Sequence, residues 1–363
     1  MLHAPLRVAG LLLALTLACL ALLFAIAISS EFRPAVRESL VAQCDERAPE
    51  LKSGASFTAV SWNLQYSAGR NQHFFYDGGT AVAVPSKEVA ETLSGITAAL
   101  RSIAPDIALL QEIDRASDRT GRVDQLPPFR TATNAPCQLS TPYHRSPFVP
   151  HPLRDPMGRV DMHLALLTPA GLTKGQRHAL PLLNESRLRQ AFNLKRALLS
   201  AELPIADSTH SLAVAVSHLS AFSTHGDTLS NQIRVLNDWM DERPPEQPWI
   251  LGADLNAIAP GADPGHLGAH ENSYRNAQPA LASLLAAHKS VFDPLDPAQR
   301  TFLPFGSSQP DRTIDYLFYG GPLELKEARV ASEYATLSDH LPLVARFTLT
   351  HNESSEKRQI PTE

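Results

Sequence analysis

The feature that most constrains the fold is a series of short apolar runs, each of which ends in a polar or acidic residue. Runs of this length and composition are typical of buried β-strands. An α/β protein usually keeps its chemistry at the carboxyl ends of its strands, so we expect these polar side chains to gather at one edge of a sheet. The runs are Phe57–Asn63, which ends in Asn63; Ile107–Leu110, followed by Gln111 and Glu112; Leu212–Ser217, followed by His218; and Trp249–Leu251, followed by Asp254 and Asn256.

Two further polar segments lie near the carboxyl end of the chain, Thr313-Ile314-Asp315-Tyr316 and Ser338-Asp339-His340. We expect Asp315 to orient His340, and Asp339 to hold a metal ion or a water. An acid that holds a histidine, with a second acid beside it, is a recurring arrangement for general acid–base catalysis. Each segment alone has a structural alternative, such as a polar turn, a solvated strand end, a core histidine or a helix cap. Six such sites in one order favour a functional interpretation.

This ordered series resembles the endonuclease/exonuclease/phosphatase superfamily, which includes deoxyribonuclease I-like nucleases and neutral sphingomyelinases. The resemblance covers about residues 56–350 and is closest to a bacterial branch of that superfamily. It implies two packed mixed β-sheets flanked by helices, which is a four-layer α/β sandwich. The motifs that carry it are Trp62-Asn63, Leu110-Gln111-Glu112, His218-Leu219, Gly252-Ala253-Asp254-Leu255-Asn256, Ile314-Asp315-Tyr316 and Ser338-Asp339-His340.

The resemblance also implies hydrolysis of a phosphoester with the help of a divalent cation. The anionic oxygens of a phosphodiester repel a nucleophile, so a cation must neutralise developing charge. Glu112 is the first candidate ligand, because a carboxylate at a strand end suits Mg²⁺, a hard ion that prefers oxygen. Asn63 would ligate or orient, and Asp339 would complete the site. Mn²⁺ is the alternative ion.

The remaining motif residues are candidates for catalysis on an in-line attacking water. Asp254 would position or deprotonate this water, and Asn256 would hold the water or a phosphoryl oxygen. His218 would hydrogen-bond the phosphate. His340, held by Asp315, would stabilise the charged transition state or act as acid or base, and the sequence leaves this division of roles open.

Four basic residues, Arg115, Arg119, Lys195 and Arg196, are candidates for binding the substrate phosphate. Solvated surface charge is the alternative for each of them. The formal net charge of −5 gives no excess of positive charge to attract nucleic acid. Three hypotheses follow: a phosphodiesterase or phosphatase acting on a lipid head group or another exported phosphoester, an extracytoplasmic nuclease, and a binding module without activity. No protein partner is implied.

The amino-terminal segment predicts membrane attachment. No residue from Val8 to Ser30 is charged, and a span needs about 20 apolar residues. We expect an uncleaved anchor in residues 1–30, although Ala25-Ile26-Ala27 resembles a cleavage site that would release a secreted protein. The anchored protein would lie in a bacterial inner membrane, with its catalytic domain on the extracytoplasmic side.

The rest of the chain is divided by composition. Residues 31–55 have the character of a polar tether, 56–350 form one domain, and 351–363 are expected to be disordered. Prolines crowd between Pro127 and Pro156, which favours a long loop there. Cys44 and Cys137 could pair in an oxidising compartment or remain free thiols. Helices are expected from Ser86 to Leu100, from Thr228 to Arg243 and from Ala280 to His288.

Overall fold

A computed structural model describes residues 3–45, 48–221, 227–265, 267 and 271–350. Over these residues the chain forms two mixed seven-stranded sheets that pack face to face. The first sheet has the strand order β1 (Arg37–Leu40), β7 (Thr173–Ala179), β8 (Ala197–Pro204), β9 (Ser211–His218), β10 (Trp249–Asp254), β12 (Asp315–Gly320) and β11 (Lys289–Ser290). The second has the order β13 (Leu323–Val330), β14 (Leu343–Leu349), β3 (Ser56–Asn63), β4 (Ile107–Asp114), β6 (Gly158–Thr168), β5 (Cys137–Val149) and β2 (Gln43–Cys44).

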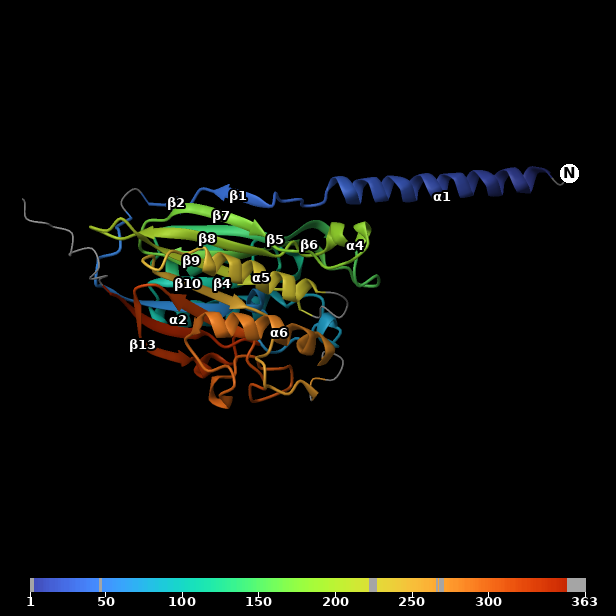
Figure 1. Cartoon of the computed structure of the whole chain (residues 1–363). Helices are drawn as coiled ribbons and strands as arrows, with labels where there is room; N and C mark the ends of the chain where they lie inside the picture. The colour runs from blue at the N-terminus through green and yellow to red at the C-terminus, as the bar shows by residue number, and fades with distance from the viewer. Residues whose placement is uncertain (1–2, 46–47, 222–226, 266, 268–270, 351–363) are drawn as a thin grey trace, which may run out of the picture.

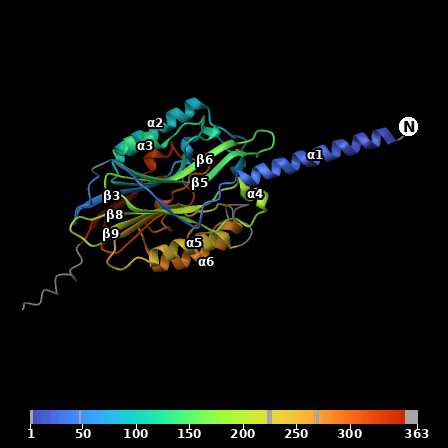
Figure 2. The ribbon, with the colours of Figure 1, turned by 90° about the horizontal axis from the view of Figure 1, so that it is seen from above.

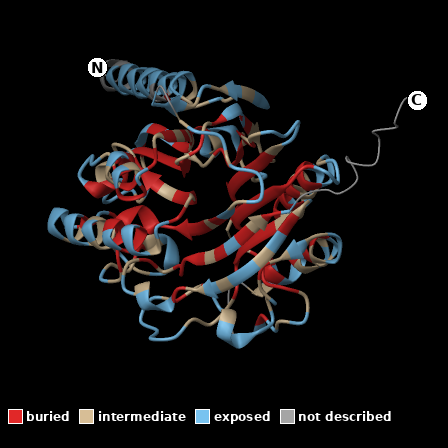
Figure 3. Cartoon of the chain, turned by 90° about the vertical axis from the view of Figure 1, so that its left-hand side faces the viewer, coloured by how far each residue is buried: buried red, intermediate tan, exposed pale blue. Residues whose placement is uncertain are grey.

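Helices cover the outer faces of both sheets (Figure 2). On the second sheet lie α2 (Ser86–Ile103) and α3 (Leu126–Ala132), and on the first lie α5 (Thr228–Asp241) and α6 (Glu271–Ala287). One apolar cluster fills the space between the sheets, and two more lie beneath the helix pairs. Buried residues accordingly fill the central strands, whereas several outer strands are largely exposed or intermediate (Figure 3). The predicted four-layer α/β sandwich is confirmed.

Cover on both faces explains why the central strands are continuous apolar runs. Every residue of β4 except Glu112 is buried, because one face of the strand meets the other sheet and the opposite face meets helices. The two sheets approach closely at Gly252 of β10. A Cβ atom there would lie 2.6 Å from Ser61 Oγ on β3 and 2.9 Å from Leu109 Cδ1 on β4, so glycine is required for this packing.

The Pro-rich stretch between Pro127 and Pro156 is not the long loop that its composition predicted. It contains α3 and most of β5, which pairs with β6 in an antiparallel ladder. Pro142 lies beside a register shift in this ladder, and a second shift spans Ser146 to Val149. Bulges are positions where a strand tolerates proline, because the missing N–H is not needed for pairing. Of the predicted helices, α6 begins earlier than expected, at Glu271.

The segment between the anchor and the domain lies against both sheets. β1 pairs with β7, β2 pairs with β5, and a disulfide joins Cys44 to Cys137 across the latter pair. Before it, α1 (His3–Ser29) projects away from the domain (Figure 1). A short helix, α4 (Arg187–Phe192), lies beside the domain end of α1. The expected disorder of residues 351–363 lies outside the described residues.

Candidate active site

Strand register brings three of the candidate residues to one level of the first sheet. Asp254, the last residue of β10, is the register partner of His218 at the end of parallel β9. It is also the partner of Asp315 at the start of antiparallel β12. Side chains directly opposite in a ladder lie on the same face and within contact distance. The fold therefore places one imidazole and two carboxylates side by side.

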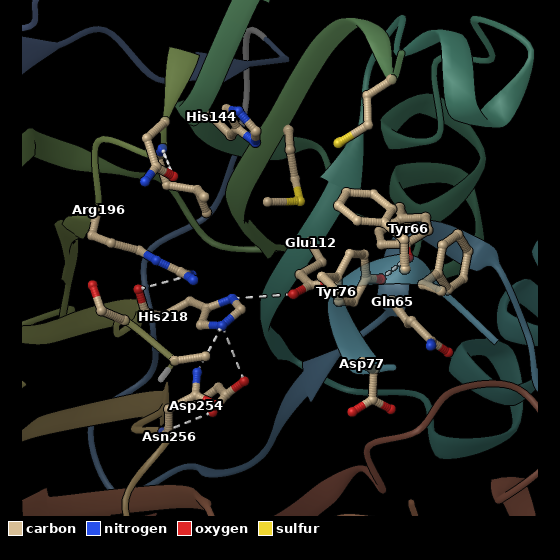
Figure 4. A pocket seen from close by; sticks show the side chains of 18 of the residues that line it. Gln65, Tyr66, Tyr76, Asp77, Glu112, His144, Arg196, His218, Asp254 and Asn256 are labelled. Atoms are coloured by element: carbon tan, nitrogen blue, oxygen red, sulfur yellow. Dashed lines mark hydrogen bonds and ion pairs between the residues drawn. The ribbon is translucent and has the colours of Figure 1, made fainter. Parts of the chain in front are cut away.

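The second sheet supplies Asn63 and Glu112 from the ends of β3 and β4. Asn63 Nδ2 donates to Asp254 Oδ2 at 3.0 Å, which links the two sheets. Glu112 has a φ of 56° and lies within a register shift between Leu110 and Ile113. Such a bulge re-aims a side chain, and here the Glu112 carboxylate faces His218, with Oε1 3.5 Å from Nδ1 (Figure 4).

His340 is anchored to β3 and held by Asp315. The Trp62 indole N–H donates to the His340 carbonyl oxygen at 2.9 Å. His340 Nδ1 lies 2.8 Å from Asp315 Oδ2, and its Nε2 lies 3.6 Å from Asp254 Oδ2. Burial alone would lower the pKa of His340, but the carboxylates of Asp315 and Asp254 outweigh it and raise this pKa well above its ordinary value. These carboxylates therefore favour the protonated form of His340.

His218 and Asp254 have the opposite protonation tendencies. Burial first, and then the positive charge of Arg196, hold the pKa of His218 well below its ordinary value, so His218 is a neutral imidazole. Its Nε2 lies 3.2 Å from Asp254 Oδ2, and its Nδ1 lies 3.1 Å from the hydroxyl of Tyr143. Burial raises the pKa of Asp254 to about 7, which is a suitable value for exchanging a proton near neutrality. The Asn256 N–H donates to Asp254 Oδ1 at 3.0 Å.

These groups face one cleft of about 860 Å³ between the ends of the two sheets. Asn63 and Asp315 stand behind Asp254 and His340 and do not line it. The structure thus brings all eight predicted metal-binding and catalytic residues into one assembly. The six that line the cleft are Glu112, His218, Asp254, Asn256, Asp339 and His340.

The four basic candidates separate into two pairs. Arg119 and Arg196 line the cleft. Arg115 and Lys195 do not, and each is bound elsewhere: Arg115 Nη2 lies 2.7 Å from Asp124 Oδ2, and Lys195 Nζ lies 2.7 Å from Glu31 Oε1. That Arg115 and Lys195 contact substrate phosphate therefore stays a prediction, and the carboxylates of Asp124 and Glu31 already hold the two cations.

Sequence reasoning missed the aromatic wall of the cleft. Tyr66 and Tyr76 hydrogen-bond through their hydroxyls beside Glu112 (Figure 4), and Phe74 packs edge-on against Tyr66. The Arg119 guanidinium stacks 3.5 Å from the centre of the Tyr66 ring while it pairs with Asp114. The aromatic density of residues 74–76 was the available signal, and it has no fixed spacing to a catalytic motif.

Two sets of side chains could hold a metal ion. Ligand atoms of Asp254, Asp315 and His340 all lie within 4.8 Å of one another. Nδ1 of His340 is already hydrogen-bonded to Asp315, however, and Asp254 Oδ2 accepts from Asn63. Glu112 and Asp339 face the cleft without a Lys or Arg partner in the described parts of the chain. Burial raises the pKa of both carboxyls, and Asp339 raises that of Glu112 further, so this pair fits a divalent cation with oxygen ligands.

Fold and cleft together define an α/β sandwich in which acids and histidines converge at one end of the two sheets. The chain matches the model of the Endonuclease/Exonuclease/phosphatase family over residues 60–340, and it belongs to that family. Members of this family are phosphoester hydrolases that typically use a divalent metal. A search among curated proteins gives no significant match.

Solved structures with the same fold come from distant relatives. A Beutenbergia cavernae endonuclease/exonuclease/phosphatase has a TM-score of 0.58 and 19% identity, with 81% of this chain and 72% of that one covered. A family protein from Bacteroides thetaiotaomicron has a TM-score of 0.51 and 16% identity, with 82% and 99% covered. The human Nocturnin catalytic domain, which has a bound sulfate anion, has a TM-score of 0.50 and 20% identity, with 88% and 99% covered.

Proposed function

We propose that this chain is a metal-dependent phosphodiesterase that α1 anchors in a membrane, with the catalytic domain on the extracytoplasmic side. The observation that carries the proposal is the convergence of Glu112, His218, Asp254 and His340 on one cleft from two different sheets. These are the groups that a phosphodiester needs: hard oxygen ligands, a proton acceptor near pH 7 and a fixed positive charge.

Glu112 and Asp339 are the proposed holders of the cation. Mg²⁺, or Mn²⁺, would neutralise charge on the phosphoryl oxygens there. Asn63 serves to orient rather than to bind, since its amide donates to Asp254 and its Oδ1 accepts from the Gln65 N–H at 3.0 Å. Gln65 in turn accepts from the Asp339 N–H through Oε1, which fixes the loop that carries Asp339.

The chain's own groups then handle the protons. Asp254 accepts a proton from the attacking water as its oxygen bonds to phosphorus, and Asn256 holds Asp254 in place. The phosphorus–oxygen bond to the leaving group breaks in line with this attack. His340 stabilises the charge that develops and supplies a proton to the leaving oxygen. Neutral His218 and the cation of Arg196 contact the phosphate.

Membrane attachment rests on α1 and on the disulfide. Val8–Ser29 has a mean hydropathy of 2.9 over its most apolar window and is long enough to span a bilayer, although a signal sequence has the same character. The bond between Cys44 and Cys137 favours an oxidising compartment, where disulfides persist. Both observations support export of the domain.

The test uses the full chain in detergent with bis-p-nitrophenyl phosphate, p-nitrophenyl phosphate and plasmid DNA, each with Mg²⁺ and again with EDTA. We expect EDTA-sensitive cleavage of the diester, and Glu112→Gln should lower its rate by at least about 10²-fold. Glu91→Gln, an exposed substitution on α2, is the matched control. Near-normal turnover of Glu112→Gln would show that the ligand assignment is wrong.

Other outcomes of the same experiment separate the alternatives. Plasmid cleavage that is far faster than diester cleavage would identify a nuclease instead. If calorimetry detects binding of neither Mg²⁺ nor Mn²⁺ and no substrate is cleaved, the domain is a binding module.

A further inference from the structure

The domain end of α1 is held against the segment just before β8, which carries a cleft residue. Glu31 follows α1 closely and forms a buried ion pair with Lys195, whose side chain is 6% exposed. The Phe32 ring lies 5.7 Å from the Arg177 guanidinium and 5.6 Å from that of Arg145. Lys195 immediately precedes Arg196, which lines the cleft. The domain end of α1 is therefore held close to the active site.

The cleft opens on the side of the domain from which α1 projects. Leu182, Leu183 and Leu188 in and before α4 line its mouth, and α4 lies beside the base of α1 (Figures 1 and 2). Strand β5 is tied to α4 as well, because His144 Nε2 lies 3.0 Å from the carbonyl oxygen of Phe192. A bilayer spanned by α1 would face this mouth.

Exposed apolar side chains gather around the mouth, and we call this set the collar. Four of its members line the cleft, and Leu153, in the β5–β6 loop, is 88% exposed. Elsewhere in the described domain, large hydrophobic side chains are exposed at Val36, Val41, Val123 and Leu295. The collar consists of Tyr76, Phe148, Leu153, Leu182, Leu188 and Phe305.

Basic residues alternate with the collar. Arg154 follows Leu153, and Arg187 and Arg189 flank Leu188 on α4. All three are exposed, and none makes an ion pair with another described residue. Leucine and aromatic side chains beside unpaired arginines are the composition of surfaces that insert into the interface of an anionic bilayer.

We propose that the collar docks on the bilayer that α1 spans, so that the cleft receives a phospholipid directly from the membrane. The substrate class rests on the proposed function. The phosphate of the lipid would reach Arg196 and Glu112. Its apolar portion would remain against the apolar side of the mouth, where Val149, Met157 and Leu194 extend the collar inward. Attachment by α1 and docking by the collar then act together, because a fixed anchor holds the mouth at the lipid surface.

Docking is tested with the full chain in vesicles of phosphatidylcholine and phosphatidylglycerol. In a Cys19→Ala background, which removes the free thiol, an environment-sensitive fluorophore is attached at Leu153→Cys or at Val41→Cys. Val41 is the matched control, since it is 92% exposed and lies on the β1–β2 connection. We expect nitroxide-labelled lipid to quench the label at 153 strongly and the label at 41 weakly. Equal quenching at both positions would overturn the docking proposal.

Lipid delivery is tested by activity. The measured quantity is the ratio of the cleavage rate of vesicle phospholipid to that of bis-p-nitrophenyl phosphate. Leu153→Asp should lower this ratio by about tenfold, because one leucine side chain no longer enters the apolar phase of the bilayer. Val41→Asp should leave this ratio unchanged. An unchanged ratio in Leu153→Asp would refute delivery from the bilayer. If the parent chain fails to cleave bis-p-nitrophenyl phosphate, the proposed function is wrong. The quenching experiment still tests whether the collar docks on the bilayer, because it does not depend on activity.

Discussion

His340 and Asp315 form a buried pair in which Nδ1 lies 2.8 Å from Oδ2, although the two residues are 25 positions apart in the chain. Thr301 Oγ1 donates to the same carboxylate oxygen at 2.7 Å, so Asp315 is itself held in place. Burial lowers the pKa of His340, and Asp315 is the largest of the three carboxylate charges that raise it. Asp315 therefore sets both the orientation and the charge of His340.

Substitution of Asp315 should be as damaging as the loss of a general acid. Asp315→Asn keeps the shape but removes the negative charge, so we expect kcat to fall by about 10²–10⁴-fold with little change in KM. Steady-state kinetics on a soluble diester measure this effect, and circular dichroism checks the fold. Thr301→Val removes the hydrogen bond to the Asp315 carboxylate and the acceptor for the N–H groups of Ile314 and Asp315, but it keeps the charge of Asp315 and should have a smaller effect. A larger loss in Thr301→Val than in Asp315→Asn would contradict the assignment.

Arg196 and Arg115 provide a matched pair for phosphate binding. Arg196 is buried at the cleft without a carboxylate ion pair among the described residues, and its closest contacts are the Tyr143 ring and the carbonyl oxygen of His218. A charge-assisted hydrogen bond to substrate is worth about 1.5–3 kcal/mol, so Arg196→Gln should lower kcat/KM by roughly 10- to 100-fold. Arg115→Gln should change it little, because Arg115 does not line the cleft and its guanidinium pairs with Asp124. Equal losses of kcat/KM in Arg196→Gln and Arg115→Gln would refute the proposal that Arg196, and not Arg115, contacts the phosphate.

The sequence predicted the central strands well because both of their faces are covered, which leaves continuous apolar runs. It missed β7 and β13, whose residues are largely exposed or half-buried and so alternate weakly. It missed β5 because proline was taken to exclude a strand, whereas the register shifts of that ladder accommodate it. These errors fall where tertiary pairing, rather than local pattern, determines the conformation.

The candidate site shows the same contrast between residues that a local pattern predicts and residues that only the tertiary structure places. Side chains at strand ends were predicted, since strand register alone places His218 and Asp254 together. Tyr66 was not, because the loop that carries it follows a left-handed path through three consecutive positive φ angles, of 44°, 40° and 59°, at Gln65, Tyr66 and Ser67. Lys195 was one of four basic candidates for phosphate binding. Its partner, Glu31, is 164 positions away, and no local pattern reveals it.

The disulfide should contribute substantially to stability. It closes a separation of 93 residues between β2 and β5, and a loop of this length typically gives about 2–4 kcal/mol by restricting the unfolded chain. Cys44 is exposed, so Cys44→Ala leaves no cavity. We expect its Tm to fall, and dithiothreitol to lower the Tm of the parent but not of the variant. If dithiothreitol does not change the Tm of the parent, the disulfide is not formed in solution.

Acid sensitivity should arise at Asp161, which lies away from the cleft. Burial alone would raise its pKa, but hydrogen bonds from His163 and Arg145, at 3.0 and 2.9 Å, lower the pKa of Asp161 to about 2. A folded-state pKa below the unfolded value of about 3.9 means that the stabilisation is complete above that value and is lost as the pH falls towards 2. The amount lost is about 2 kcal/mol.

Denaturant unfolding of the parent and of Asp161→Asn between pH 5 and pH 2.5 measures this contribution. The parent should lose stability more steeply as the pH falls, because Asp161 must take up a proton only in the unfolded chain over this range. Asp161→Asn should be less stable at pH 5, and its stability should depend less on pH. Asp155→Asn, an exposed substitution in the β5–β6 loop, should follow the parent. Parallel curves for the parent and Asp161→Asn would show that Asp161 has the same pKa in the folded and unfolded chains.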